Sequence, residues 1–304
     1  MIAKRTTAFG LKMKHQASLL ILLAPAMIWY IAFNFIPLIG NLASFTNLKS
    51  VVLPWKIVGF DNFIRMYKSP DFWTAFWNTL IISFFYIVFY FPMPIILALL
   101  MNELKNRSFK RAVQTIVYIP YFFSWVVVGS IFITLLAPNR GIVNIIIGFF
   151  GGPSDTYFMA STQWFRPVLV MSYIWRQVGY GTVIYLAALS TVDLELYDAA
   201  KVDGAGYWLQ LIHITLPSIR NTIVTMLLLN LSAVMRIFDQ ILVMQIPAVY
   251  SVSDVLRTYA FREGLDNRAI GYATAVSLLT SLLSCLLVLS MNKISKAIFD
   301  ESVL

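Results

Sequence analysis

Long runs without a charged side chain are the feature that most constrains how this 304-residue chain folds. Four such runs separate the pairs His15 and Lys49, Asp71 and Glu103, Arg111 and Arg140, and Arg268 and Lys293. Each exceeds the roughly 20 apolar residues that a helix needs to cross the hydrocarbon core of a bilayer. Two further apolar stretches contain isolated charges. We therefore expect an all-α integral membrane protein with six transmembrane helices, at residues 17–40, 76–102, 112–137, 167–190, 221–246 and 269–291.

The composition agrees with burial in lipid. Only 12% of the residues are charged, whereas soluble domains carry about 25%. No internal repeat or low-complexity tract divides the chain, so we predict a single domain over residues 1–304. The run 17–40 is longer than the apolar part of a signal peptide, and no clear cleavage site follows it. It is therefore predicted to stay as the first helix.

The distribution of Lys and Arg predicts the orientation. With the N-terminus inside, the cytoplasmic segments 1–16, 103–111, 191–220 and 292–304 carry 12 of these residues, against 9 in the outer loops. Eight of the inner charges lie beside the first three helices, where they weigh most in orientation. Both tails, 1–16 and 292–304, are expected in the cytoplasm.

Several other functions are not favoured. The net charge of +9 is dispersed over short loops without an aromatic-interleaved basic face, so we expect no nucleic-acid binding. Cys285 is the only cysteine, which excludes an internal disulfide and a cysteine-based zinc cluster, and no metal site is predicted. The apolar segment 142–150 is too short to span and is expected to be an interfacial or re-entrant helix on the outer side.

The longest inner connection, residues 191–220, has the pattern of a helical hairpin. Asp193 can cap a first helix, and Gly204 with Gly206 can end it. A second short helix follows and ends near Pro217. The acidic side chain of Asp198 precedes two small alanines, which leave a smooth surface. The pattern indicates a docking module for a soluble partner on the cytoplasmic face.

This connection resembles the "EAA" loop of the permease subunits of bacterial ABC importers, with Asp198 where that family usually has Glu. The resemblance covers the spacing from the acidic residue through the glycine to the leucine–proline pair. It implies an ATPase-coupling role for Asp198, Ala199, Ala200, Asp203, Gly204, Ala205, Ile214, Leu216 and Pro217.

Further motifs resemble the carbohydrate-uptake branch of these permeases, the maltose-type and complex-oligosaccharide group. They are spread over nearly the whole chain, at residues 58–63, 72–79, 118–121, 141–144 and 238–240. The sequence departs from that branch after the fifth span, where 245–247 reads Gln-Ile-Pro and many sugar permeases have Thr-Gly-Gly-Pro.

The resemblance implies the type I importer fold, with a permease core at about 76–291, in the inner membrane of a bacterium. It also implies a second permease subunit (a paralogue, giving a heterodimer), two ATPase subunits and an extracytoplasmic solute-binding protein. The chain has no phosphate-binding loop and not even a Gly-Lys pair. We therefore expect it to be no enzyme and to bind no cofactor, with ATP and Mg on the ATPase subunits.

Charges inside the spans are candidates for the substrate path, because a charge at mid-bilayer costs about 2.5–3.5 kcal/mol. Arg176 and Arg236 are both expected near mid-membrane, facing a polar cavity with Asp239. The aromatic residues near Arg176 that could stack on sugar rings are Tyr173, Trp175 and Tyr180. The alternative for Arg236 is a structural ion pair with Asp239, three residues further along the same helical face.

Three other functions are alternatives to this interpretation. The chain could be an ABC importer permease for a solute other than a sugar, or an ion-coupled secondary transporter, although no internal symmetry is visible. An intramembrane enzyme is disfavoured because the chain has no His-Glu-x-x-His or Gly-x-Ser-x-Gly motif and no convincing pair of buried carboxylates.

Overall fold

The computed structural model describes residues 17–49 and 55–299, and within these ranges the chain is almost entirely helical, without a strand. The predicted N-terminal tail, 1–16, lies outside the described residues. Three helical stretches are long and apolar enough to cross a membrane: Ile21–Phe45, Pro70–Asn102 and Ile270–Lys293. Two bent helix pairs raise the number of candidate spans to as many as five. The six-span topology and the cytoplasmic termini stay predictions.

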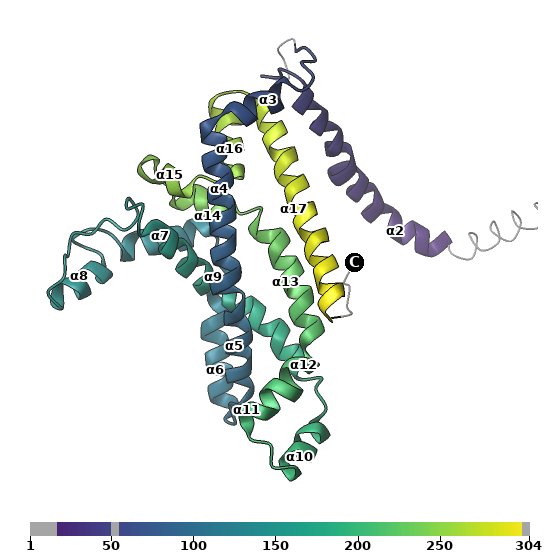
Figure 1. The fold of residues 1–304 in the computed structure, drawn as a ribbon, viewed down its shortest axis with the longest axis vertical. Helices are drawn as coiled ribbons and strands as arrows, with labels where there is room; N and C mark the ends of the chain where they lie inside the picture. The colour runs from purple at the N-terminus through teal and green to yellow at the C-terminus, as the bar shows by residue number, and fades with distance from the viewer. Residues whose placement is uncertain (1–16, 50–54, 300–304) are drawn as a thin grey trace, which may run out of the picture.

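The first apolar stretch is one continuous helical run that leaves the bundle. It comprises α2 (Ala17–Tyr30), a π-helical segment (Ile31–Phe35) and a 3-10 segment (Ile36–Phe45). In Figure 1, α2 points away from the other helices, and the run meets them where its end packs against α17 (Ile270–Phe299). Every side chain from Ile21 to Tyr30 is exposed. This run can be stable only where lipid or protein covers it.

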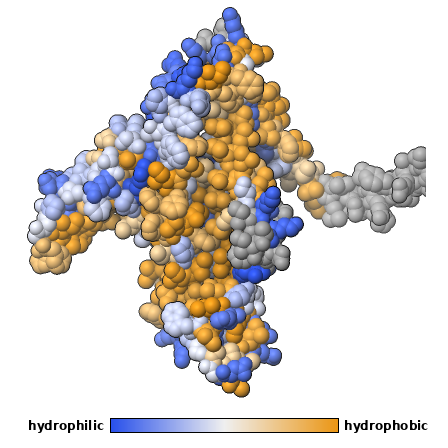
Figure 2. Space-filling model, viewed as in Figure 1, coloured by the Kyte–Doolittle hydropathy of each residue, from blue (hydrophilic) through white to orange (hydrophobic). Residues whose placement is uncertain are grey.

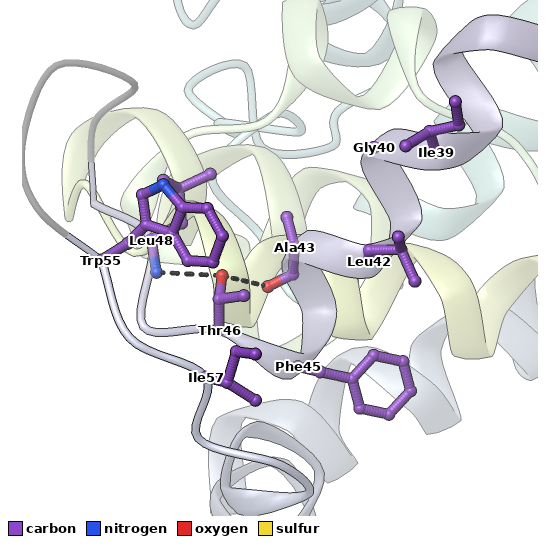
Figure 3. A pocket seen from close by; sticks show the side chains of 9 residues that line it. All are labelled: Ile39, Gly40, Leu42, Ala43, Phe45, Thr46, Leu48, Trp55 and Ile57. Carbon is purple, nitrogen blue, oxygen red and sulfur yellow. Dashed lines mark hydrogen bonds between the residues drawn. The ribbon is translucent and has the colours of Figure 1, made fainter.

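An apolar recess of about 630 Å³ lies at the end of this first run (Figure 3). Thr46 closes the helix by donating to Ala43 O at 2.8 Å and accepting from Leu48 N at 3.3 Å. Side chains of the helix end and of the returning chain, including Trp55 and Ile57, line the recess, and none of its lining residues is charged. An uncharged lining of this kind is suited to contact with hydrocarbon chains.

The second apolar stretch comprises α4 (Pro70–Phe85), a π-helical segment (Tyr86–Tyr90) and α5 (Pro92–Asn102), and it follows the short helix α3 (Asp61–Lys68). Ser69 caps α4 by accepting from Phe72 N, and Pro70 fits the first turn because its missing N–H has no partner there. Before Pro92 the ladder widens, with Phe91 N donating to Tyr86 O. The wider turn lets the helix continue through its prolines.

The stretch predicted as a third span, 112–137, is not one straight helix. Helix α6 (Arg107–Tyr118) continues as a 3-10 turn (Ile119–Phe122), and α7 (Trp125–Leu135) then leaves at 105° to it. Ser124 caps the new helix by accepting from Val127 N. The expectation of a continuous helix is therefore wrong here, because a serine cap after Pro120 starts a second helix inside an uncharged run.

The chain beyond α7 forms an arm that extends sideways from the bundle (Figure 1). It carries α8 (Ile142–Phe149), which at eight residues is too short to span a membrane. Buried Asn144 holds the arm together by donating to Ala137 O at 2.9 Å and to Thr156 O at 3.0 Å. Phe149 and Phe150 are exposed at its end.

Helix α9 (Phe165–Leu189) is the long central helix and covers most of the predicted fourth span. The predicted fifth span, 221–246, is broken instead of continuous. Helix α13 (Arg220–Val234) ends before α14 (Asp239–Met244) begins, and Arg236 lies in the break. The expectation of one helix fails at this point because buried side chains elsewhere in the bundle hold α14 in place.

Gln240 is the buried residue that holds α14. Its amide nitrogen donates to Leu169 O and Ser172 Oγ of α9, both at 2.8 Å, and its amide oxygen accepts from Tyr86 Oη at 2.7 Å. The side chain is 1% exposed. One amide therefore joins three parts of the bundle, and water has no access to replace these bonds.

Replacing Gln240 by leucine is expected to destabilise the protein by about 1–3 kcal/mol for each polar partner left unsatisfied. Thermal unfolding of the purified protein in detergent, followed by tryptophan fluorescence, measures this. The matched control is Gln245→Leu, since the Gln245 amide has only a 3.4 Å contact from Ser253 Oγ. Equal unfolding temperatures for the two variants would contradict the role assigned to Gln240.

The last part of the chain closes the end of the bundle near α3 (Figure 1). Four short helical elements follow α14 and lead to α17. They are a 3-10 turn (Pro247–Val249), α15 (Tyr250–Ser253), α16 (Leu256–Phe261) and a π-helical turn (Arg262–Asp266). Figure 2 shows hydrophobic residues over the middle of the molecule and hydrophilic residues gathered near α3 and near α10, at opposite ends. This distribution is typical of a bundle that crosses a bilayer.

Candidate functional site

The hairpin predicted for residues 191–220 forms one end of the molecule (Figure 1). Helix α10 (Leu194–Val202) begins at Asp193, whose carboxylate accepts from Glu195 N at 2.9 Å. It ends at Gly204, which has φ +79°. The chain then forms α11 (Tyr207–Gln210), a π-helical turn (Leu211–Thr215) and α12 (Leu216–Ser218). Left-handed backbone of this kind strongly favours glycine, so the turn depends on Gly204.

Two hydrogen bonds hold the two arms of the hairpin together across Gly204. Tyr197 Oη lies 2.9 Å from Thr215 Oγ1, and Ala205 N donates to Ala200 O at 2.8 Å. Within the second arm, Gln210 Nε2 donates to Ala205 O at 2.7 Å. The hairpin therefore has the internal bonding of a unit that can move as one body.

The residues assigned to coupling divide into two groups. Asp198, Ala199, Asp203, Gly204 and Pro217 are exposed, whereas Ala200, Ala205, Ile214 and Leu216 are half-buried within the hairpin and at its base. Asp198 is paired with Lys201 at 2.9 Å, but both side chains are mostly exposed, so the pair adds little stability. The exposed group is the surface available to a partner.

Apolar side chains missed in the sequence extend this surface. Leu194, Val202 and Trp208 are 75%, 89% and 71% exposed, respectively. Large apolar groups this exposed at a pole of the molecule mark a contact surface, since they gain by removal from water. In the sequence, these residues are recognisable as apolar positions on an amphipathic hairpin that lies outside the predicted spans.

A second candidate site is a cavity of about 310 Å³ in the middle of the bundle. It lies between the second stretch, the bend after α6, α9 and α13. Its lining residues combine aromatic rings with polar groups: Tyr90, Tyr121, Tyr173, Arg176, Gln177, Tyr180, Ile184, Met226, Leu229, Asn230 and Ala233.

Arg176 joins this cavity to the bend between α6 and α7. Its Nε donates to Phe123 O at 2.9 Å, a carbonyl left outside both helices by the break. The guanidinium lies 4.7 Å from the centre of the Trp125 ring. The Arg176 guanidinium therefore bonds to a carbonyl that the break leaves without a helical partner, and the same group faces the cavity. Such freed carbonyls need a hydrogen-bond partner inside a membrane.

The aromatic residues of the cavity differ in availability. Tyr173 is 9% exposed and stacks on Tyr86 with ring centroids 4.2 Å apart. Tyr180 is 48% exposed and stacks on Tyr121 at 4.7 Å. Of the predicted stacking residues, Tyr180 has free ring surface for a ligand, whereas Tyr173 mainly builds the wall.

Three predicted path residues lie outside this cavity. Trp175 lines a separate apolar recess of about 580 Å³, with Phe132 at 5.9 Å. Arg236 is exposed at the break after α13 and bonds to Ser232 through Nε and Nη2. Asp239 is exposed at the start of α14. Among the described residues, Arg236 and Asp239 form no ion pair within 4 Å, so that alternative is wrong.

Sequence reasoning missed Gln177, Asn230, Tyr90 and Tyr121 as cavity residues. Asn230 had a usable signal, because it is a polar residue on the same helical stripe as Met226 and Ala233. Tyr121 reaches the cavity through the bend after α6, and Tyr90 through the packing of the second stretch against α9, whereas Gln177 directly follows Arg176 in the chain.

Comparison with known proteins identifies the family to which this architecture belongs. Residues 91–299 match the family described as the binding-protein-dependent transport system inner membrane component. The chain belongs to this family. The resemblance identified in the sequence is thereby confirmed, and the chain is a multi-pass component of the inner membrane.

Relatives of this inner membrane component cover almost its full length. Protein LplB of Bacillus subtilis is 38% identical over 95% of this chain and 91% of its own length. The polygalacturonan/rhamnogalacturonan transport system permease protein YteP, also of Bacillus subtilis, is 36% identical over 96% of this chain and 92% of its own.

A solved structure extends the comparison to the fold. A chain of a bacterial ABC transporter involved in import of the acidic polysaccharide alginate superposes with a TM-score of 0.89 and 35% identity, covering 96% of this chain and 99% of that chain. A chain of a bacterial alginate ABC transporter, solved in complex with an alginate pentasaccharide-bound periplasmic protein, also superposes with a TM-score of 0.89 and 35% identity. The chain therefore has the type I ABC permease fold.

Proposed function

We propose that this chain is the permease subunit of an ATP-driven importer and forms part of the path for a sugar or oligosaccharide delivered by an extracytoplasmic binding protein. The carrying observation is the near-complete agreement in length and fold with permeases of saccharide transport systems. The cavity of tyrosines, an arginine and amides supports it, because sugar rings stack on aromatic faces and bond to polar groups.

The energy is proposed to come from two ATPase subunits that each receive one permease hairpin. The exposed surface of α10 and its neighbours supports this proposal. The hydrogen bonds within the hairpin let it transmit a displacement as a rigid body. A second permease subunit, a paralogue of this chain, would complete the path. Both termini and the hairpin would then lie in the cytoplasm.

The direct test uses the complete transporter. The tagged chain, expressed with its gene neighbours, is expected to co-purify with an ATPase. Proteoliposomes made from the complex are expected to accumulate saccharide only when ATP is present on the side of the membrane that the hairpin faces. Accumulation driven by an ion gradient without ATP would favour the secondary transporter. A solute other than a saccharide as the only cargo would favour the non-sugar permease.

Orientation is tested by thiol labelling in a Cys285→Ala background. A cysteine at Ala199, which is exposed on the hairpin, should react only with reagents that reach the cytoplasm. The matched control is Tyr157→Cys, on the arm at the opposite predicted side and 50% exposed. Labelling of Ala199→Cys from outside intact cells would overturn the coupling assignment.

Replacing Arg176 by alanine is expected to lower the rate of saccharide uptake by about tenfold or more, because it removes a charged hydrogen-bond donor worth about 1.5–3 kcal/mol. Arg176→Lys keeps the charge but loses the fork geometry of the guanidinium, so its uptake rate should lie between those of the unmodified protein and of Arg176→Ala. Uptake by intact cells, corrected for the amount of protein in the membrane, gives the comparison. Unchanged uptake in both variants would remove Arg176 from the path.

A further inference from the structure

The wall of α13 that faces the cavity continues to a second arginine. Met226, Asn230 and Ala233 line the cavity and recur at helical spacing. Arg236 follows Ala233 by three residues, and its side chain is exposed where α13 ends. Arg236 N donates to Ala233 O at 2.9 Å in the turn that follows α13, so the chain carries Arg236 directly past the last cavity residue of this helix.

A third arginine reaches the same place from the outer end of the bundle. Arg257, on α16, donates from Nη1 to Arg236 O at 3.1 Å. Its side chain is exposed. The break between α13 and α14 therefore brings the guanidinium of Arg257 and the backbone of Arg236 together.

These three arginines lack the partners that other arginines of the protein have. Arg65 pairs with Glu263, and Arg262 pairs with Asp254. In the described ranges 17–49 and 55–299, no carboxylate lies within 4 Å of Arg176, Arg236 or Arg257. Within these ranges, therefore, no direct ion pair neutralises any of the three guanidinium groups.

Most of the hydrogen-bond donors of these groups are also unused within the described structure. A guanidinium has five N–H donors. Arg176 and Arg257 each donate one bond, both to backbone carbonyls, and Arg236 donates two to Ser232. The planar fork of a guanidinium matches a carboxylate with two parallel bonds, which a neutral sugar hydroxyl cannot reproduce.

We propose that the cargo of this permease is an oligosaccharide that carries carboxylate groups, and that Arg176, Arg236 and Arg257 hold those groups along the path. This inference rests on the proposed function and names the substrate class. The exposed ring of Tyr180 supplies the apolar face for a sugar ring, and the arginines supply the charge that the acidic groups need.

The test measures binding to the purified transporter, with its ATPase and second permease but without the binding protein. The probes are trigalacturonate and its fully methyl-esterified form, which has the same rings without charge. We expect tighter binding of the acid at low salt and weakening as salt rises. Arg176→Gln and Arg236→Gln should each weaken binding of the acid about tenfold, the scale of one lost charged hydrogen bond, with little effect on the ester.

Arg65→Gln is the matched control, because it removes a positive charge that is already paired with Glu263 at 3.3 Å. It should keep the preference for the acid. Arg236→Lys guards against a folding defect, since it retains the charge and should retain most of the preference. Equal affinity for both probes, or binding of neither, overturns the inference. If ATP-driven uptake of a neutral oligosaccharide persists in that case, the proposed function stands and only the charge of the cargo was assigned wrongly.

Discussion

Replacing Gly204 by valine is expected to abolish most ATP-driven accumulation of solute while leaving the chain in the membrane. Gly204 has φ +79°, where an L-residue costs roughly 1–2 kcal/mol and a β-branched residue more. To avoid this strain the turn must change, and α10 then leaves its position relative to α11. Under the proposed coupling role, a displaced hairpin cannot transmit a movement of the ATPase, so we expect uptake to fall by about tenfold or more.

Gly206→Val is the matched control for this substitution. An added Cβ meets no atom within 4 Å at either glycine, so the two positions offer similar space. They differ in backbone, because Gly206 has φ −71°, which any residue adopts. Uptake in proteoliposomes and ATPase activity are measured together, since a loss of coupling lowers uptake per ATP hydrolysed. If both variants lose uptake equally, the backbone of the turn is not the cause.

Replacing Gly179 by alanine is expected to lower the unfolding temperature and distort the cavity. An added Cβ on this α9 residue would overlap Val117 O and lie 3.0 Å from Tyr118 Cα, so α9 and α6 would have to separate. Overpacking between two backbones costs about 1–3 kcal/mol, because neither side has a flexible side chain to yield. Tyr180, the neighbouring residue, carries the exposed ring of the cavity.

The control for Gly179 is Gly40→Ala, in the first helical run, where an added Cβ meets nothing within 4 Å. That substitution should leave the unfolding temperature unchanged or slightly raised, because alanine favours helix over glycine by about 0.5–1 kcal/mol. Thermal unfolding in detergent compares the two. A similar midpoint for Gly179→Ala and the unmodified protein would contradict the close approach of α9 and α6.

The hairpin could be predicted in detail from the sequence because its signals are local. Asp193 caps the first helix, Gly204 supplies the left-handed turn, and both work through residues only a few positions away. Ser69 and Pro70 at the start of α4 are local signals of the same kind, although the predicted span began only at residue 76. Helix starts and glycine turns are set by neighbours in the chain, so one sequence is enough to place them.

The broken helices could not be predicted in the same way. An uncharged run satisfies a hydropathy criterion whether it is straight or bent. The bend at residues 123–124 combines the local Ser124 cap with a hydrogen bond from Arg176, which is 53 residues away from Phe123 in the sequence. The path residues show a related limit. Trp175 and Arg176 are adjacent, yet successive residues differ by about 100° around a helix, so they line different cavities. Only the packing of α9 decides which residue faces which side.

The bond from Arg176 to Phe123 O has a consequence for how the bundle senses its contents. The same guanidinium secures the angle between α6 and α7 and borders the space where a ligand would sit. An occupant that pulls this group inward must weaken its hold on the corner, and a change of the corner must alter the affinity for the occupant by an equal factor. An occupant that changes the bond from Arg176 to Phe123 O would therefore also act on the side arm that begins at α7.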